Sequence, residues 1–394
     1  MIERIKQLAA AYHADTVAVR RHLHAHPELS FQETETSAFV CAQLDALGIA
    51  YTAGHVGTGI VAHIYGKDPQ SKVIALRGDM DALPITEEST KDYCSQNPGV
   101  MHACGHDVHT ACLLGAARIL HELRGEWSGT VKLVFQPGEE RLPGGASLMI
   151  QEGALDSPKA SAIFGQHVAP DLEVGKVGFR AGMYMASTDE LYVTVHGEGG
   201  HGALPHTLTD PVLIAAHIIT GLQQVVSRIA KPGVPCVLSF GKVIANGSTN
   251  VIPDKVEMEG TFRAMDEIWR EDAHLHMIQI AQGIAESMGG SCDFRVEQGY
   301  PFLVNDTPLT RLAQDAARSY LGPENVVDLD LRMTAEDFSY YSQIMPACFY
   351  RLGTRNILED ILSGVHTSTF DVDERSLEIG AGLMAHLALE TLKA

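Results

Sequence analysis

A pattern that recurs three times in the first half of the chain constrains the fold most: a short apolar run that ends abruptly in polar residues. The runs cover residues 73–76, 131–135 and 160–168. The polar residues at their ends are, in chain order, Asp79 and Asp81, Glu139 and Glu140, and His167. Between the first two runs, apolar residues at helical spacing predict a helix over about 107–123. Apolar strands joined by a helix predict a sheet covered on both faces.

Ligands of such a sheet bind beyond the carboxyl ends of its strands. Because all three runs end in polar residues there, we expect a site at this edge. Cys104 and His106 flank a glycine just before the predicted helix, so both side chains can point toward the same edge. Thiolate and imidazole bind borderline-soft divalent metals. A buried thiol beside surface histidines is the alternative interpretation of this pair.

The adjacent acids Glu139 and Glu140 strengthen the metal hypothesis. Neighbouring side chains after a strand point in different directions, so one carboxylate can bind a metal while the other faces the bound water. A water activated by a metal still needs a base to collect its proton, and a nearby carboxylate suits that work. A solvated acidic loop is the alternative, because exposed glutamate is common.

Two single histidines and two aspartates complete the candidates. His167 ends the third apolar run, whereas His366 has only its glycine-flanked loop to recommend it. A lone histidine is more often structural than a ligand. Asp79 and Asp81 are either ligands or acceptors that orient a ligand imidazole, and a charged turn is an equally good interpretation.

From about residue 190 the pattern changes, and 394 residues suggest two domains. Strands are predicted over 191–197, 236–245, 255–264 and 291–298, with helices over about 211–230 and 268–288. The resulting order, β-α-β-β-α-β, is the ferredoxin-like arrangement. We therefore expect an α/β domain with a mixed, mainly parallel sheet, formed by residues 1–185 and 299–394. A ferredoxin-like α+β domain is inserted at 186–298.

Composition excludes several classes of partner. With 29 basic and 49 acidic residues the formal net charge is −20, so neither nucleic acid nor a membrane is expected as a partner. The seven cysteines form no CxxC pair, and the charged N-terminal segment lacks the apolar stretch of an export signal. Both features favour the cytoplasm. The uncharged run at 211–227 contains His217, Gln223 and Gln224, so we expect a core helix there and not a membrane span.

A series of motifs spans nearly the whole chain. They are, in order, RGDMDALP, NPGVMHACGHDVHTA, a GEE pair, GQHV, GGHGALPH, GSTNVIPD and GTFR. With these motifs the sequence resembles the M20 metallopeptidases, and within them the aminoacylase-like amidohydrolases that include hippurate and auxin-conjugate hydrolases. HACGHD is the most specific motif, because other M20 branches generally have a carboxylate as the bridging ligand.

The resemblance implies two divalent metal ions per subunit. The ligands that match the family are Cys104, His106, Glu140, His167 and His366. Five side chains for two ions suggest a bridging ligand, and Cys104 is the expected one. Glu139 matches the general base and Asp81 a supporting carboxylate. Thiolate and imidazole favour zinc, cobalt or nickel, while manganese stays open because availability often outweighs affinity.

The resemblance also assigns the inserted domain a part in catalysis, as a lid and dimerisation domain. His201, in a glycine-rich loop, matches a histidine that reaches the active site of the partner subunit and stabilises the tetrahedral oxyanion. Asn250 and Arg263 match positions that hold the substrate's carboxylate, a task suited to a guanidinium. A homodimer, or a higher homo-oligomer, is therefore expected.

Three functions follow, of which the first is preferred: hydrolysis of an N-acyl amino acid to a carboxylate and a free amino acid, by metal-activated water with Glu139 as base. The second uses the same centre on peptides, as a dipeptidase or carboxypeptidase, or on N-acetyl-diaminopimelate as a deacetylase. The third is a non-catalytic binding protein stabilised by its metals, which would leave the spare base Glu139 without a purpose.

Two further clusters are given structural roles. His22, His24 and His26 scatter around a helix and match no metal ligand of the family. The segment 333–338 is another family motif, and its acids are expected to cap a helix or support the site through hydrogen bonds.

Overall fold

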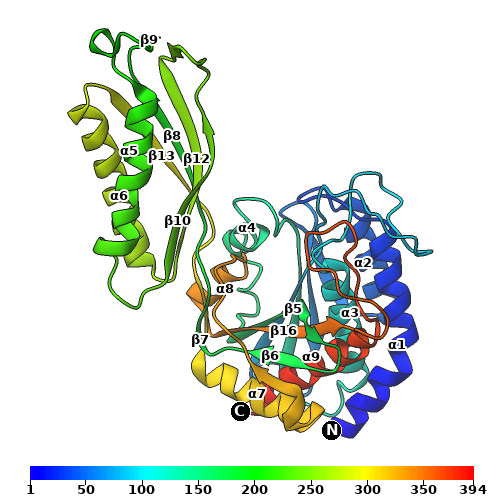
Figure 1. Cartoon of the computed structure of the whole chain (residues 1–394). Helices are drawn as coiled ribbons and strands as arrows, with labels where there is room; N and C mark the ends of the chain where they lie inside the picture. The colour runs from blue at the N-terminus through cyan, green and yellow to red at the C-terminus, as the bar shows by residue number, and fades with distance from the viewer. The chain divides into compact units, whose positions relative to one another are not determined.

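The computed structural model describes residues 1–394, and the chain divides into two compact units (Figure 1). The first unit comprises Met1–Tyr184, Val304–Leu331 and Asp337–Ala394. The second comprises Met185–Leu303 and Arg332–Glu336. The second unit is therefore an insertion in the chain of the first.

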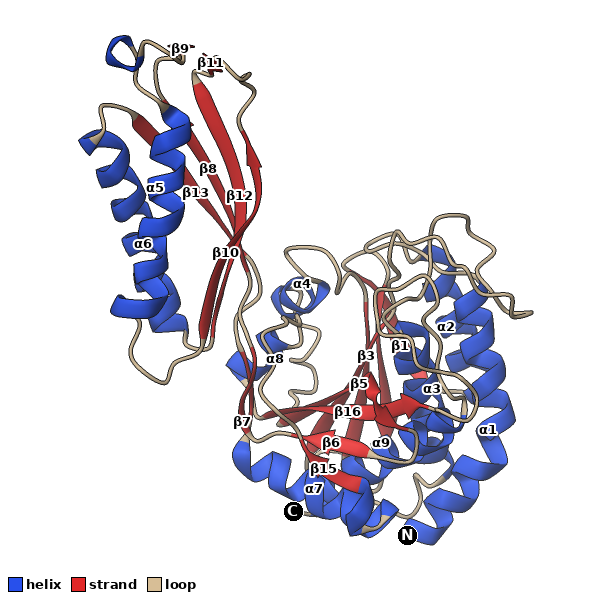
Figure 2. Cartoon of the chain, in the orientation of Figure 1, coloured by secondary structure: helices blue, strands red, loops and turns tan.

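An eight-stranded sheet forms the centre of the first unit (Figure 2). Its strands, in spatial order, are β1 (Ala50–His55), β2 (Gly59–Tyr65), β4 (Thr130–Gln136), β3 (Val73–Asp79), β5 (Ala162–Glu173), β16 (Ala347–Arg355), β6 (Val177–Phe179) and β15 (Val326–Asp328). The neighbours β4–β3, β3–β5, β5–β16 and β6–β15 are parallel, and the other three pairs are antiparallel. The mixed, mainly parallel sheet that the apolar runs predict is confirmed.

Helices cover both faces of this sheet. They are α1 (Ile2–Ala25), α2 (Thr34–Leu47), α3 (His106–Glu122), α4 (Gly145–Gln151), α7 (Thr307–Leu321), α8 (Ser339–Ile344) and α9 (Arg375–Lys393), with a 3₁₀ turn at Pro323–Asn325. The crossover from β3 to β4 through α3 and the crossover from β4 to β5 through α4 run in opposite directions along the sheet. Because such crossovers are right-handed, α3 and α4 lie on opposite faces (Figure 2).

The central strands explain the apolar runs of the sequence. Strands β3 and β4 are buried over their whole length, as an interior strand covered on both faces must be. Strand β5 does not end at His167, as predicted, but continues to Glu173. It does so because β16 remains its partner, with Arg351 opposite His167. The pairing of β5 with β3 stops at Gly165, so His167 still lies beyond the paired end of β3.

The second unit pairs one antiparallel sheet with two helices. The sheet order is β10 (Cys236–Ile244), β12 (Lys255–Ala264), β8 (Asp189–His196) and β13 (Ser291–Gln298). The helices are α5 (Pro211–Gln224), which continues into a π-helical turn at Val225–Ile229, and α6 (Glu267–Ser287). Asp210 and Asp266 accept backbone N–H groups at the start of α5 and α6, as N-cap residues do.

Five short elements complete the second unit and its connections. Strands β9 (Gly200–His201) and β11 (Val251–Ile252) pair with each other, and a 3₁₀ turn lies at Pro205–Thr207. Strands β7 (Gly182–Met185) and β14 (Leu303–Asn305) contain points where the chain passes between the units.

The helical segment Pro211–Ile229 is long and apolar enough to cross a membrane by length and composition alone. A single helix of this kind is weak evidence for a membrane span. Here Ile214, Ile218 and Leu222 belong to the apolar core of the second unit. The segment therefore has a place in a folded core, as its sequence predicts.

We expect Arg77→Leu to destabilise the first unit strongly. The fully buried guanidinium of Arg77 donates to Asp79 (2.5 Å) and Asp337 (2.8 Å). Its loss leaves two buried carboxylates without their cation, and breaking a buried ion pair costs about 3–5 kcal/mol. The measurement is the urea midpoint of unfolding. The matched control is Arg295→Leu, which removes an ion pair with Glu297 on the surface of the second unit. Equal midpoints for the two variants would contradict the expectation.

Candidate metal centre

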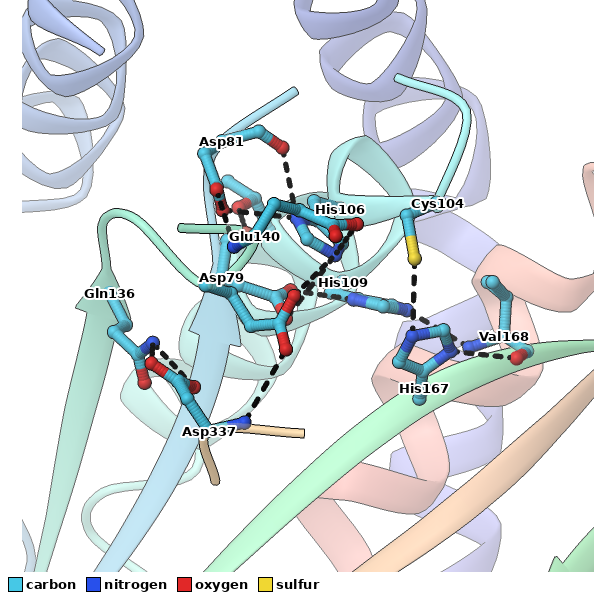
Figure 3. Close-up of polar contacts among 12 residues, drawn as sticks. Asp79, Asp81, Cys104, His106, His109, Gln136, Glu140, His167, Val168 and Asp337 are labelled. Carbon is cyan, nitrogen blue, oxygen red and sulfur yellow. Dashed lines mark hydrogen bonds and ion pairs between the residues drawn. The ribbon is translucent and has the colours of Figure 1, made fainter. Parts of the chain in front are cut away.

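Cys104 and His106 owe their direction to the glycine between them. Gly105 has a φ of +80°, and a Cβ on this residue would lie 2.6 Å from a methyl carbon of Val168. Both the left-handed conformation and the close contact require glycine. The turn at Gly105 starts α3 and leaves Cys104 and His106 facing His167, which lies within β5 (Figure 3).

Side chains at this edge of the sheet form overlapping groups of metal donors. Within each group the ligand atoms lie within 4.8 Å of one another. Three of these groups are Cys104, His106 and His167; Cys104, Glu140 and His366; and His106, Glu139 and Glu140. Every predicted ligand belongs to at least one group, and Cys104 joins two of them. The structure therefore brings together the five side chains that the sequence singles out.

The donor atoms of the cluster lie close to one another. Cys104 Sγ lies 3.5 Å from His167 Nε2, and His366 Nε2 lies 3.2 Å from Glu140 Oε1. His106 Nε2 lies 3.9 Å from the same Glu140 oxygen. His106 Nε2 is buried and has no hydrogen-bond partner, although buried polar atoms normally have one. A sulfur, nitrogen and oxygen donor set of this kind suits a borderline divalent cation.

Asp81 supports two of these side chains from behind. The Nδ1–H of His106 donates to the Asp81 backbone oxygen (2.9 Å) and lies 3.2 Å from its Oδ1. This leaves His106 Nε2 facing the other donors. The second carboxylate oxygen of Asp81 accepts the backbone N–H of Glu140 (3.0 Å). Asp81 therefore orients the imidazole of a candidate ligand, which matches the second of the roles that the sequence left open.

His109 supports His167 in a similar way, and the sequence analysis gave it no role. The N–H of Val168 donates to His109 Nε2 (2.9 Å), so the proton of this ring sits on Nδ1 and is donated to Asp79 (2.6 Å). His167 Nδ1–H donates to the Val168 carbonyl (2.8 Å), which leaves Nε2 toward Cys104. The available signal was the spacing of His109 three residues after His106, on the same face of a helix.

The charge of the site favours cations. Burial would lower the pKa of His106, but Asp79 and Cys104 raise it well above its ordinary value. Hydrogen bonds to Cys104 and Glu140 raise the pKa of His366 to about 10. Neighbouring acidic side chains thus favour the protonated form of two imidazoles, which is the behaviour expected of a site that attracts positive charge.

His167 differs from the other two ligand histidines. Burial, together with the nearby cation of Arg351, lowers the pKa of His167 well below its ordinary value. The ring is therefore neutral with its lone pair on Nε2. A neutral imidazole is the form that binds a metal.

Glu139 is buried beside this cluster and lies as close to His106 as Glu140 does. Its Oε2 lies 3.9 Å from His106 Nε2, and its Oε1 accepts the backbone N–H of Asp337 (3.4 Å). Asp337 in turn accepts hydrogen bonds from Arg77, Gln136 and the N–H of Ala146. The predicted supporting role for acids of the segment 333–338 is thus met by Asp337 through backbone and side-chain hydrogen bonds.

His201 and Asn250 lie together in the second unit. His201 pairs with Val251 across the β9–β11 bridge, and the N–H of Gly202 donates to the Asn250 carbonyl (2.9 Å). Both side chains are exposed. They lie beyond the Lys255 end of β12, because Asn250 precedes that strand by a few residues.

Arg263 lies at the other end of the same strand. β12 contains ten residues, so at ~3.4 Å per residue about 30 Å separates Arg263 from the Asn250 region. Arg263 lines a groove of about 480 Å³ on the sheet of the second unit, and its Nη1 is buried without a hydrogen-bond partner. Within one chain, Asn250 and Arg263 therefore cannot hold the same small carboxylate.

The histidines of the N-terminal helix take structural places. His24 is buried and bonds through Nδ1 to Asp107 (2.7 Å), which also accepts from the buried Arg20 (2.8 Å). His22 and His26 pack against each other, with ring centres 4.5 Å apart. None of the three belongs to the donor groups of the metal centre.

Comparison with known proteins agrees with this geometry. A model of peptidase family M20/M25/M40 matches residues 75–390. The N-acyl-L-amino acid amidohydrolase of Geobacillus stearothermophilus is 44% identical over 77% of this chain and 81% of the relative. An N-acetylcysteine deacetylase of Bacillus subtilis is 39% identical over 97% of this chain and 99% of its own length.

A solved structure is similar over the same extent. It is a dinuclear metal-binding peptidase of the M20 family from Bacillus subtilis, 36% identical, with a TM-score of 0.84 over 98% of this chain and 99% of that one. The likeness thus covers nearly the whole chain. The chain belongs to peptidase family M20/M25/M40, fits its aminoacylase-like branch, and is a metal-dependent amide hydrolase.

Proposed function

We propose that this chain is a dinuclear metal-dependent amidohydrolase that cleaves N-acyl amino acids to a carboxylate and a free amino acid. The observation that carries the proposal is the pair of donor groups that share Cys104, with the buried Glu139 beside them. Relatives named for acyl-amino acid hydrolysis support the choice of substrate.

In this proposal Cys104 bridges two cations, and the four remaining ligands are His106, Glu140, His167 and His366. Divalent cations at such a centre act as Lewis acids and lower the pKa of water. Zinc, cobalt, nickel and manganese all suit the donor set, and the thiolate favours the softer ions. Asp81 keeps His106 in the tautomer that a ligand needs.

Glu139 acts as the general base. Its carboxylate lies next to the donors without belonging to the predicted ligand set, so it can take a proton from water and return it to the leaving amine. Asp337 N–H holds one of its oxygens, which fixes the direction of the other.

The second unit acts as a ferredoxin-like lid and dimerisation domain. The antiparallel order β10-β12-β8-β13 with two helices supports this assignment. His201 donates a hydrogen bond to the oxyanion in the partner's active site, and Asn250 and Arg263 hold the substrate's carboxylate in the dimer. The role of His201 requires a homodimer.

A peptide substrate is the second candidate. The M20 structure from Bacillus subtilis is described as a peptidase, and a dipeptide presents the same amide beside a free carboxylate. A dipeptidase, a carboxypeptidase or an N-acetyl-diaminopimelate deacetylase would use the same residues.

We place the enzyme in the cytoplasm, with neither nucleic acid nor membrane as a partner, since its formal net charge is −20.

We expect Cys104→Ala and His366→Ala to differ in how much metal they bind. Because Cys104 belongs to two donor groups, its loss weakens both sites, whereas His366 belongs to one. Elemental analysis after dialysis against trace zinc or manganese should give well under one ion per Cys104→Ala chain and about one per His366→Ala chain. Equal metal content in the two variants would exclude a bridging thiolate.

We expect Glu139→Gln to keep its metals and lose hydrolysis. General-base catalysis contributes roughly 10²–10⁴-fold, so kcat should fall by about that factor. The assay measures amine release by metal-reconstituted enzyme from N-acetyl and N-benzoyl amino acids, dipeptides and N-acetyl-diaminopimelate. Turnover of dipeptides alone would select the peptidase alternative, and a parent rate in Glu139→Gln would show that the base is another group.

We expect two inactive variants to complement each other. In a mixed dimer of His201→Ala and Glu139→Gln chains, one active site combines the intact Glu139 of one chain with the intact His201 of the other. Random reassembly of equal amounts should restore about a quarter of the parent activity. Mixing His201→Ala with His201→Asn is the control and should restore none. If the first mixture also stays inactive although mixed dimers form, His201 does not act across the interface.

A further inference from the structure

Two buried carboxylates hold the backbone on either side of Glu139. The N–H of Gly138, just before Glu139, donates to Glu33 Oε1 (2.8 Å). The N–H of Glu140, just after it, donates to Asp81 Oδ2 (3.0 Å). The peptide that carries the proposed base is therefore anchored at both ends by acceptors from other parts of the chain.

Glu33 lies in the loop between α1 and α2, far from Glu139 in sequence, and is fully buried. Besides Gly138 N–H, its Oε1 accepts the N–H of Phe31 (2.9 Å). Its Oε2 accepts the hydroxyl of Thr58 (2.8 Å). Three donors thus converge on a buried carboxylate, an arrangement that fixes its position.

The contact between this loop and Gly138 is close and strained. Phe31 has a φ of +65°, which is rare for a bulky residue, and Gly138 has a φ of +62°. A Cβ on Gly138 would lie 2.3 Å from the Phe31 ring. Strain of this kind persists only where the surroundings determine it, and it gathers at functional sites.

The same loop also reaches the second anchor. The hydroxyl of Ser30 donates to Asp81 Oδ2 (2.6 Å), the oxygen that accepts Glu140 N–H. Ser30 and Glu33 therefore connect one short segment to both anchors of Glu139. Neither residue belongs to the metal donor groups.

We propose that Glu33 is a positioning residue for Glu139. Its Oε1 fixes the Gly138 amide, while Asp81 fixes the amide on the other side of Glu139. Together they determine where the Glu139 carboxylate meets water. This inference rests on the proposed function, in which Glu139 is the base. It gives a specific role to a residue that lies outside the ligand set and touches neither substrate nor metal.

The test compares Glu33→Met with Glu33→Gln. Methionine has a similar length but accepts no backbone hydrogen bond, so kcat should fall roughly 10- to 100-fold, the cost of a misplaced group. KM and metal content should stay at parent values. Glutamine keeps one acceptor oxygen for Gly138 and Phe31, while its NH₂ can donate to the Thr58 oxygen, so this variant should retain most of the parent kcat. The matched control is Glu35→Met, an exposed glutamate two residues on.

Glu33→Asp covers the case in which Glu33→Met folds poorly. Its carboxylate is too short to reach Gly138, so kcat per metal-loaded chain should again fall. A merely structural role predicts instead a lower melting temperature with a parent kcat per loaded chain, and that result would overturn the proposal. Parent kcat in Glu33→Met would overturn it as well.

A double variant separates this inference from the proposed function. If Glu33 acts through Glu139, adding Glu33→Met to Glu139→Gln should leave the residual rate of Glu139→Gln unchanged. A further fall by the factor seen in the parent background would overturn the positioning role while Glu139 remains the base. A parent rate in Glu139→Gln itself would remove the base assignment, and the positioning proposal with it.

Discussion

The crowding of acidic side chains at one edge of a buried sheet is the constraint on which the rest of this site depends. Glu139 and Glu140 meet the Cys104 thiol there, backed by Asp79 and Asp81. Buried like charges repel one another unless cations or hydrogen bonds compensate them. Arg77 and backbone N–H groups compensate the supporting acids, so the attraction for further cations is concentrated at the donor cluster.

Much of this arrangement follows from short-range sequence signals. Parallel strands end at a common edge, so apolar runs that lead into Asp79, Glu139 and His167 predicted the meeting of these residues before their distances were known. The cysteine and histidine at the start of α3 joined them because a strand-helix-strand unit returns to the same edge. His366 lacked such a signal. The pairing of the strand and turn before its loop cannot be inferred from the local sequence, so only the family resemblance identified His366 as a candidate ligand.

What the sequence could not predict depends on contacts between distant segments. Strand β5 continues past His167 because β16, almost two hundred residues later, remains its partner. Glu33 reaches the loop of Glu139 from a segment about a hundred residues earlier in the chain. It is an ordinary acid in its local sequence, and its role appears only when the Gly138 N–H that it accepts is known.

The supports of the centre also differ in kind from its donors. A metal donor must keep a lone pair directed at the cation. The lone pairs of a supporting carboxylate, by contrast, accept hydrogen bonds from fixed donors. Asp81 and Glu33 do the latter completely, accepting N–H and O–H groups on both carboxylate oxygens. Glu140 Oε1, by contrast, faces the imidazoles of two other candidate ligands, His106 and His366. The kind of neighbour thus distinguishes supports, which accept fixed backbone and hydroxyl donors, from candidate ligands, which face other metal donors.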